Sequence, residues 1–182
     1  MGLEQEIKLA YPDVEAARQA VVTAGGRLVV SRRLIEDEHF DTIDGRLRSG
    51  GTALRVRRDG STTRLTFKGP VHAGPVKSRE EIETSVADGD VLRQILAALH
   101  FEPVFRAQKY REEYALDDAT VTVDDTPIGC FVEIEGPEAT ITHVAARLGR
   151  PPADYLLDSY PALWRRHCEA RGTEKRDMLF QT

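Results

Sequence analysis

Charged or polar residues alternate with aliphatic residues along much of this chain, which is the pattern of strands with two different faces. The opening segment, 3–9, places Glu4, Glu6 and Lys8 on alternate positions and aliphatic residues on most of the positions between them. Successive side chains of a strand point to opposite faces, so the three charges would share one face. Taken alone, the segment is typical of a half-buried strand whose polar face meets water.

Later segments repeat this alternation. We predict seven further strands, at 27–41, 53–58, 64–68, 79–86, 104–116, 120–124 and 130–135. Asp59-Gly60, between two of them, is a strong hairpin signal, and the short spacings favour antiparallel pairing. The segments 42–52 and 69–76 contain several glycines and are predicted to be loops.

Four segments with apolar residues at helical spacing interrupt the strand pattern. The spacing of apolar residues predicts helices at 13–24, 88–100, 138–148 and 159–171, and a short helical turn at 154–157. Asp13 and Asp88 are suitable N-cap residues, and Gly25-Gly26 ends the first helix. The charged tail, 172–182, is expected to be mobile. No domain-scale linker divides the chain, so we expect one domain over residues 1–182.

The apolar stripes of the helices and the aliphatic faces of the strands must cover one another. In one arrangement the ionic faces then curve towards each other around a wet interior, as in a barrel or tunnel. In the other, the sheet is open, the helices pack behind it and the charged face meets solvent. Patterning alone favours neither arrangement.

Composition narrows the class of protein. The chain has 182 residues, 41% hydrophobic and 30% charged, as in a globular protein of one domain or two small ones. Its net charge of −5 argues against a nucleic-acid binder held by a global basic field. Cys130 and Cys168 are not in metal-type spacing and are expected to be reduced thiols. With no leader and no spanning segment in the sequence, we expect a cytoplasmic protein without membrane contact.

The ionic faces suggest a class of ligand. Converging Arg and Lys side chains suit phosphate oxygens, and converging carboxylates suit Mg²⁺ or Mn²⁺, so a polyphosphate with a divalent metal would satisfy both. For any single residue, a cross-strand ion pair is the simpler interpretation. His39 shares a phase with Asp37 and Asp41, but we interpret it as an ordinary hydrogen-bonded group. Tyr160 is interpreted either as core or as closing one end of a cavity.

An ordered set of motifs then resembles a known family, the CYTH superfamily or triphosphate tunnel metalloenzymes. The motifs run over nearly the whole chain: Glu4-x-Glu6-x-Lys8, Ala53-Leu54-Arg55-Val56-Arg57, Thr66-Phe67-Lys68-Gly69-Pro70, Arg79-Glu80-Glu81-Ile82-Glu83, Lys109-Tyr110-Arg111, Thr122-Val123-Asp124 and Phe131-Val132-Glu133-Ile134-Glu135-Gly136. One departure is Asp37-Glu38-His39-Phe40-Asp41, because many relatives have Tyr at the position of His39.

The resemblance implies an α+β fold, namely a closed eight-stranded antiparallel β-barrel with helices packed outside. Of the two arrangements above, it therefore favours the tunnel over the open sheet. It implies Mg²⁺ or Mn²⁺ as cofactor, with metal ligands at Glu4, Glu6, Asp124, Glu133 and Glu135. It implies triphosphate binding by Lys8, Arg55, Arg57, Lys68, Arg79, Lys109 and Arg111. Of these, Glu4, Glu6 and Lys8 are the expected catalytic residues.

The expected function is metal-dependent hydrolysis of inorganic or organic triphosphates inside the tunnel. One alternative is a class IV adenylyl cyclase, which would convert ATP to cyclic AMP and pyrophosphate. A second alternative is a non-catalytic module that binds polyphosphate or nucleotide. The expected partner is a small triphosphate, namely tripolyphosphate, ATP or thiamine triphosphate, and no nucleic acid is expected. Homodimer formation is left open.

Overall fold

The computed structural model describes residues 2–174 and 176–181, in which eight strands and five α-helices follow one another along the chain. The strands are β1 (Gly2–Tyr11), β2 (Arg27–Thr42), β3 (Ala53–Asp59), β4 (Thr62–Lys68), β5 (Lys77–Val86), β6 (Phe101–Leu116), β7 (Ala119–Thr126) and β8 (Gly129–Glu135). The helices are α1 (Val14–Thr23), α2 (Arg46–Ser49), α3 (Gly89–Ala98), α4 (Glu138–Arg147) and α5 (Tyr160–Arg171), with a 3₁₀ turn at Pro152–Asp154.

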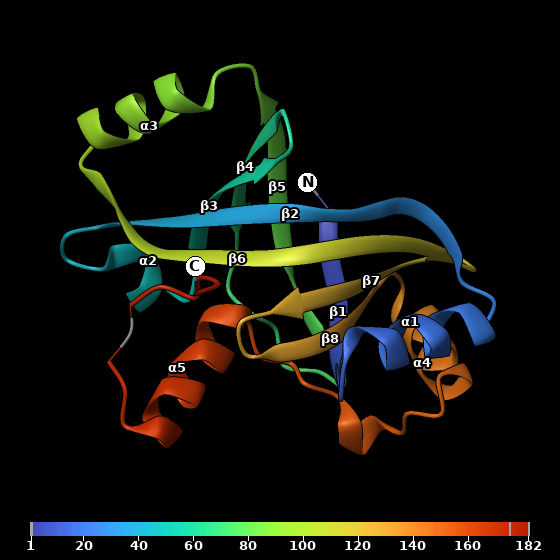
Figure 1. The fold of residues 1–182 in the computed structure, drawn as a ribbon. Coiled ribbons are helices and arrows are strands. Elements are labelled where there is room, and N and C mark those ends of the chain that lie inside the picture. Colours follow the sequence, from blue (N-terminus) through green and yellow to red (C-terminus); the bar gives the residue numbers. More distant parts are fainter. Residues whose placement is uncertain (1, 175, 182) are drawn as a thin grey trace.

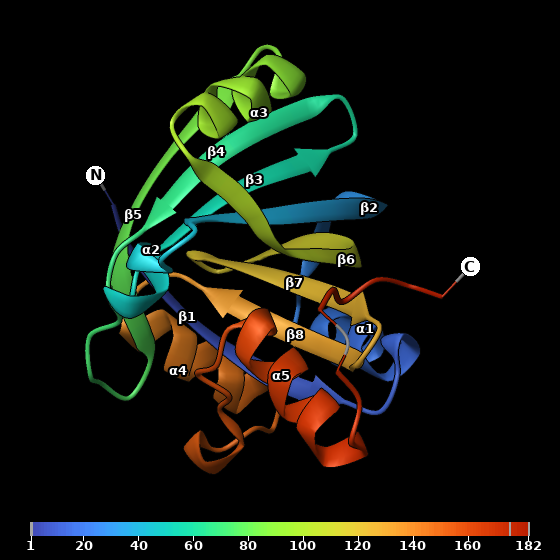
Figure 2. The same cartoon turned by 90° about the vertical axis from the view of Figure 1, so that its left-hand side faces the viewer.

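The strands form a closed antiparallel barrel in the order β1-β5-β4-β3-β2-β6-β7-β8, and this confirms the predicted fold class (Figures 1 and 2). The first strand closes the ring because it pairs with β5 on one side and β8 on the other. Glu6 is therefore opposite Lys77 across one pairing and opposite Glu135 across the other. Closure places strands from both ends of the sequence around one interior.

The predicted caps and turns account for the local structure. The Asp13 carboxylate accepts a hydrogen bond from the Ala16 N–H at 2.8 Å, and the Asp88 carboxylate accepts from the N–H groups of Asp90 and Val91. These bonds satisfy N–H groups that lack partners at a helix start. Gly60, in the turn between β3 and β4, has φ of 59°, a left-handed conformation that glycine adopts without steric cost.

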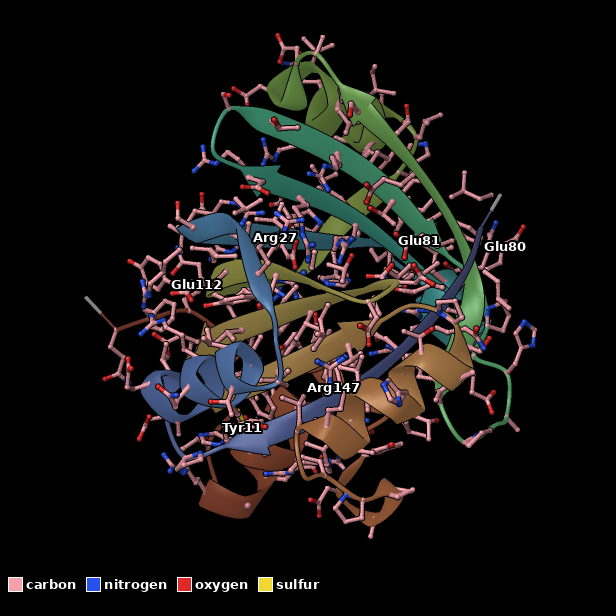
Figure 3. The ribbon with its side chains drawn as sticks, turned by 90° about the vertical axis from the view of Figure 1, so that its right-hand side faces the viewer. Tyr11, Arg27, Glu80, Glu81, Glu112 and Arg147 are labelled. Carbon is pink, nitrogen blue, oxygen red and sulfur yellow. The ribbon has the colours of Figure 1, made fainter. Side chains whose placement is uncertain are left out.

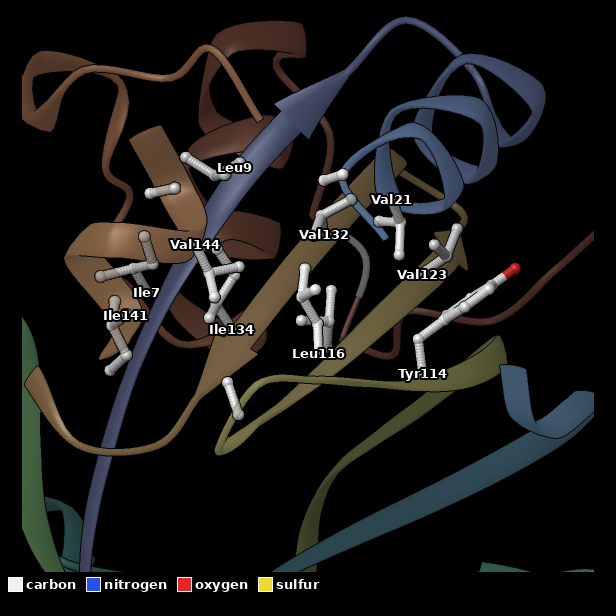
Figure 4. Packing of buried hydrophobic residues seen from close by; sticks show 14 of the residues in the cluster. Ile7, Leu9, Val21, Tyr114, Leu116, Val123, Val132, Ile134, Ile141 and Val144 are labelled. Carbon is white, nitrogen blue, oxygen red and sulfur yellow. The ribbon is translucent and has the colours of Figure 1, made fainter. Parts of the chain in front are cut away.

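The apolar cores lie outside the barrel wall. Helices α1 and α4 cover β1, β7 and β8, where Ile7, Val21, Val132 and Ile134 are fully buried (Figure 4). Helix α3 covers β2 and β3 in the same way through Leu92 and Leu96, which pack with Phe40 and Val56. Since the aliphatic faces point outward to the helices, the charged faces point inward. No helix within the described ranges is long and apolar enough to cross a membrane.

The sequence prediction for the segment 42–52 needs correction. The segment 42–52, predicted as a loop, contains α2, because the Asp41 carboxylate accepts hydrogen bonds from the N–H groups of Leu47 and Arg48 at 2.8 and 3.0 Å. Asp41 therefore holds the start of that helix and does not face the interior with Asp37.

The C-terminal tail contacts the barrel at Met178, and its expected mobility stays a prediction. Its backbone exchanges hydrogen bonds with β6, from the Met178 N–H to the Arg106 carbonyl and from the Gln108 N–H to the Met178 carbonyl, both at 2.9 Å. The Met178 side chain is fully buried with Ala107, Trp164 and Cys168. The tail occupies the edge of β6 before β7 pairs with that strand from Tyr110 onward.

Candidate functional site

The barrel contains a cavity of about 270 Å³, and most of the residues that line it are charged. Among the described residues, nine Lys and Arg side chains line it, and nine Asp and Glu side chains balance them. The basic set is Lys8, Arg55, Arg57, Arg64, Lys68, Lys77, Arg79, Lys109 and Arg111. The acidic set is Glu4, Glu6, Asp37, Asp59, Glu81, Glu83, Glu113, Glu133 and Glu135.

Strand alternation directs these side chains inward. Figure 3 shows the adjacent residues Glu80 and Glu81 on opposite sides of β5, and Glu81 lies on the barrel interior. The same period of two places Glu4, Glu6 and Lys8 of β1 on the cavity wall while Ile7 and Leu9 pack under the helices. The interior is therefore built by the alternation that the sequence displays.

The carboxylates of β1 are held by cations from β4 and β5. Glu4 accepts from Lys68 Nζ at 2.6 Å and from Arg79 Nε at 3.4 Å. Glu6 accepts from Lys8 Nζ at 3.1 Å and also from Lys77. Burial alone would raise the pKa of Glu6, but Lys8 and Lys77 hold the pKa below its usual range. The Glu6 carboxylate is thus ionised, and both carboxylates are paired with cations.

Lys8 links β1 to β8. Its ammonium group lies 3.0 Å from Glu133 Oε1 and 3.1 Å from Glu6 Oε1, and its side chain is almost fully buried. Burial would lower the pKa of Lys8, but Glu133 and Glu6 outweigh it and raise the pKa above its usual value. The ammonium group is therefore charged and directed at the cavity.

Asp124 organises the basic groups of β6. Its carboxylate accepts from Lys109 Nζ at 2.7 Å, from Arg111 Nε and Nη2 at 2.6 Å each, and from the Tyr160 hydroxyl at 2.7 Å. The Asp124 side chain has no solvent exposure and does not line the cavity. These donors occupy both of its oxygens, so in this structure the residue acts as an anchor for two cavity cations.

A second anchor lies on β2. Asp37 accepts a bidentate pair of hydrogen bonds from Arg57, both at 2.7 Å, while Arg55 donates to the Thr66 hydroxyl at 3.2 Å. His39 lines the cavity beside these residues, and its ring centroid lies 5.6 Å from that of Phe105. Burial, opposed by the charge of Asp37, lowers the pKa of His39 to about 4. The imidazole is therefore neutral near pH 7.

Glu135 lies on the cavity wall near the carboxylates of Glu4, Glu6 and Glu133. Burial raises the pKa of Glu135 to about 7, and the charges of Glu4, Glu6 and Glu133 add to this effect. A divalent ion would relieve this repulsion, and carboxylate oxygens are the donors that Mg²⁺ and Mn²⁺ prefer. The donor chemistry fits such an ion, although within residues 2–174 and 176–181 no three His, Cys, Asp or Glu side chains are already grouped as a metal site.

Three buried polar atoms of cavity-lining residues have no hydrogen-bond partner among the described residues. They are Arg55 Nε, Glu81 Oε2 and Thr122 Oγ1, and of these Glu81 Oε2 lies 2.7 Å from Lys68 Nζ in an ion pair. A buried polar atom left unpaired is costly, so atoms of this kind point to a missing ligand or water. Arg55 and Thr122 line the cavity, where a ligand with several oxygen atoms would supply acceptors.

The cavity is also bounded by residues that follow the barrel in sequence. Ser159, Tyr160, Pro161 and Met178 line it, whereas every other lining residue within the described ranges lies on a strand. The Tyr160 ring centroid lies 5.3 Å from Lys8 Nζ and 4.6 Å from Lys109 Nζ. Its edge-on contact with Phe131 has a centroid distance of 5.7 Å. Tyr160 lines the cavity and also packs against the buried cluster that contains Trp164 and Met178, so the structure agrees with both interpretations of this residue.

The structure brings nearly all of the sequence-predicted site residues to one cavity, with only Asp124 behind its wall. Sequence reasoning missed Lys77, because the predicted strand began at Arg79. Extending that strand back by two residues in the same phase would have included it. Asp37 and Glu81 also line the cavity, although neither is among the predicted site residues.

Comparisons with known proteins agree with this geometry. The family model of the CYTH domain matches residues 2–148. A candidate adenylate cyclase of Methanocaldococcus jannaschii is 33% identical over 134 residues, which are 73% of this chain and 76% of the relative.

Solved structures have the same fold. The PH1819 protein of Pyrococcus horikoshii OT3 superposes with a TM-score of 0.73 at 26% identity, over 90% of this chain and 99% of that chain. A candidate adenylate cyclase of Vibrio parahaemolyticus has a TM-score of 0.78 at 19% identity, over 90% and 98% of the two chains. The Hippeastrum protein HpAC1, described as a candidate adenylyl cyclase with a dominant triphosphatase activity, has a TM-score of 0.65 at 17% identity, over 96% and 98%.

Members of this family are adenylyl cyclase-like or triphosphatase enzymes, and their chemistry generally depends on a divalent metal. The match over residues 2–148, the relative at 33% identity and the closed ionic barrel lead to one conclusion. This chain belongs to the CYTH domain family.

Proposed function

We propose that this protein is a divalent-metal-dependent triphosphatase that hydrolyses inorganic or organic triphosphates inside its barrel. The observation that carries the proposal is the barrel cavity with nine cationic and nine anionic side chains on its described wall. A phosphate chain with divalent metal carries negative charge for the Lys and Arg side chains and positive charge for the carboxylates. Its oxygens would pair with Lys and Arg, and its metal ions with carboxylates.

Binding would exchange partners within the cavity. Lys8, Lys68 and Arg79 are now paired with carboxylates at 2.6 to 3.4 Å. Phosphate oxygens would take over these cations, and the carboxylates so released would become available to a metal. Arg57 and Arg111, held by Asp37 and Asp124 through pairs of hydrogen bonds, are already oriented to donate their remaining N–H groups.

The residues that would hold the metal are Glu4, Glu6 and Glu135, with Glu133 beside them. When bound, a divalent ion neutralises phosphate oxygens and lowers the pKa of a water molecule for attack on phosphorus. The chain's own contribution is to align the phosphates with Lys8, Arg55, Arg57, Lys68, Arg79, Lys109 and Arg111. In this proposal Asp124 orients Lys109 and Arg111 and reaches a metal only if its present donors are displaced.

A class IV adenylyl cyclase is the second candidate, and the relative from Methanocaldococcus jannaschii is the observation that favours it. In that case the ribose 3′-hydroxyl of ATP attacks the α-phosphorus and pyrophosphate leaves. The reactions differ in their nucleophile and products, while the phosphate-binding cations would be shared. On the same fold, the Hippeastrum protein is described with a dominant triphosphatase activity.

A product panel tests the proposal. The purified protein is incubated with tripolyphosphate, ATP or thiamine triphosphate, each with Mg²⁺ or Mn²⁺. Release of orthophosphate with the matching diphosphate is expected. Cyclic AMP with pyrophosphate would instead establish the cyclase, and binding without any product would establish a non-catalytic module.

One variant tests the metal assignment. Glu4→Gln keeps the shape of the side chain but removes the charge that Lys68 and Arg79 now pair with. Turnover of tripolyphosphate should fall at least about 100-fold, the scale seen when one electrostatic contact to a transition state is lost. The control is Gln5→Ala, on the same strand but outside the cavity. Unchanged turnover in Glu4→Gln would remove Glu4 from the proposed metal ligands.

A further inference from the structure

Lys77 is a buried cation of the barrel cavity at the first residue of β5. The residue before it, Val76, is buried in the apolar cluster outside the barrel wall, and successive side chains of a strand point to opposite faces. The Lys77 side chain is therefore directed inward, where it is opposite Glu6 in the pairing of β5 with β1. An ammonium group is thus held beside a carboxylate that we propose as a metal ligand.

The ion pairing of Lys77 differs from that of the other cavity lysines. Each of the others lies within 3.8 Å of two carboxylates, and these are Lys8, Lys68 and Lys109. Among the described residues, Lys77 is paired with Glu6 alone. No second carboxylate would therefore hold this ammonium group if Glu6 took another partner.

Glu6 lies between cations on one side and a carboxylate on the other. Lys8 and Lys77 both donate to its Oε1 atom, so two ammonium groups share one oxygen and repel each other. On the opposite side of β1, Glu135 is the cross-strand partner of Glu6. Neighbouring carboxylates favour a divalent cation, which would need the same Glu6 carboxylate that Lys77 now uses.

We propose that Lys77 competes with the divalent cation for Glu6 and becomes a triphosphate-binding residue when both ligands enter the cavity. This inference rests on the proposed function. The flexible four-carbon stem of lysine permits such a change of partner, and a phosphate oxygen is a strong acceptor for its ammonium group. Lys77 would then be paired both before and after binding, as a buried charge requires.

The competition predicts opposite effects on two ligands when the charge of Lys77 is removed. Lys77→Met keeps most of the volume of the side chain but has no ammonium group. Metal should bind more tightly, because Glu6 loses a competing cation, and triphosphate should bind more weakly, because the cavity loses a donor. A residue that only stabilises the fold would give a different result, since a loosened cavity would bind both ligands more weakly.

Two titrations measure these effects without turnover. Mn²⁺ is titrated into the protein in the absence of phosphate, and the paramagnetic resonance signal of free Mn²⁺ reports binding. Tripolyphosphate is titrated separately in a calorimeter, with a chelator present to remove metal. Relative to the wild type, Lys77→Met should bind Mn²⁺ at least about tenfold more tightly and tripolyphosphate at least about tenfold more weakly, each equivalent to about 1.4 kcal/mol.

The control is Arg165→Met, which removes one positive charge from an exposed side chain of α5. Because salt screens exposed charges that are far from the cavity, both dissociation constants should stay within about twofold of the wild type. Unchanged or weaker Mn²⁺ binding in Lys77→Met would overturn the proposal, as would unchanged or tighter binding of tripolyphosphate. If thermal unfolding shows that Lys77→Met does not fold, Lys77→Gln replaces it, since glutamine is uncharged but can still donate a hydrogen bond.

An assay of hydrolysis separates this inference from the proposed function. Opposite shifts in a protein that hydrolyses no triphosphate would refute the triphosphatase and retain the competition by Lys77. Turnover of tripolyphosphate by the wild type, without the opposite shifts in Lys77→Met, would retain the triphosphatase and refute the competition. A wild type that binds neither Mn²⁺ nor tripolyphosphate would refute both.

Discussion

Replacing Asp124 with asparagine removes the negative charge from a carboxylate that has no solvent exposure. Lys109 and Arg111 donate to it at 2.6 to 2.7 Å, and Tyr160 donates at 2.7 Å. Burial would raise the pKa of Asp124, but Arg111 and Lys109 outweigh it and lower the pKa, so the carboxylate is charged in the folded protein. Asparagine would leave two enclosed cations without this counter-ion.

The expected cost follows from that geometry. Removing one partner of a buried ion pair typically costs about 3–5 kcal/mol, and the lower end, about 3 kcal/mol, applies here because Glu133 still pairs with Arg111 and Lys109. For a chain of this size, each kcal/mol lowers Tm by about 2–4 °C, so Asp124→Asn should lower Tm by about 6–12 °C. The neighbouring Asp125 offers a matched control. Its pair with Arg32 is 2.6 Å long but partly exposed, so Asp125→Asn should cost less than about 1 kcal/mol.

Thermal unfolding with and without tripolyphosphate provides the assay. The triphosphate would supply negative charge to Lys109 and Arg111, so the ligand-induced rise in Tm should be larger in Asp124→Asn than in the wild type. If Asp124 serves mainly as a metal ligand, the variant should instead need more Mg²⁺ for half-maximal turnover with little change in Tm. A Tm within 2 °C of the Asp125→Asn control would refute the anchor role.

Two further predictions concern pH. Burial, opposed by Asp37, lowers the pKa of His39 to about 4, so the imidazole is already neutral above about pH 5.5 and His39→Gln should leave the shape of the pH–kcat profile unchanged from there to about pH 8. A shifted profile would show that His39 titrates in this range. Burial, with Glu112 as the next cause, raises the pKa of Tyr114 to about 12. The folded protein keeps this proton after the unfolded chain loses it near pH 10, so the free energy of unfolding should fall between about pH 10 and pH 12. Urea unfolding of Tyr114→Phe should show a smaller fall, and an equal fall would contradict the assignment.

The strands and the inward charges were predictable because one rule, a period of two, determines both. Glu4, Glu6 and Lys8 alternate with residues that pack outside, and the structure confirms which face is which. Closure of the barrel could not be obtained from patterning, because an open sheet has the same alternation. It depends on β1 meeting β8, a pairing between distant segments that the family resemblance supplied.

The remaining differences arise where tertiary contacts decide. Asp41 continues the charged phase of β2, yet its carboxylate binds the start of α2, and alternation cannot distinguish these two uses of an acid. Met178 is a single apolar residue in a polar tail and has no periodic neighbours. Only the unpaired edge of β6 and the pocket beside Ala107 account for its burial.

The pairing of β1 with both β5 and β8 has a consequence for how the chain folds. Of the eight strands, β1, which carries Glu4, Glu6 and Lys8, is synthesised first. Its partner β8 is synthesised only after β7. Pairings between segments so far apart in sequence slow folding, because a long loop must close before its contacts form. We expect the ionic interior to remain hydrated through most of folding and to be enclosed in a late step, when β8 joins the first strand.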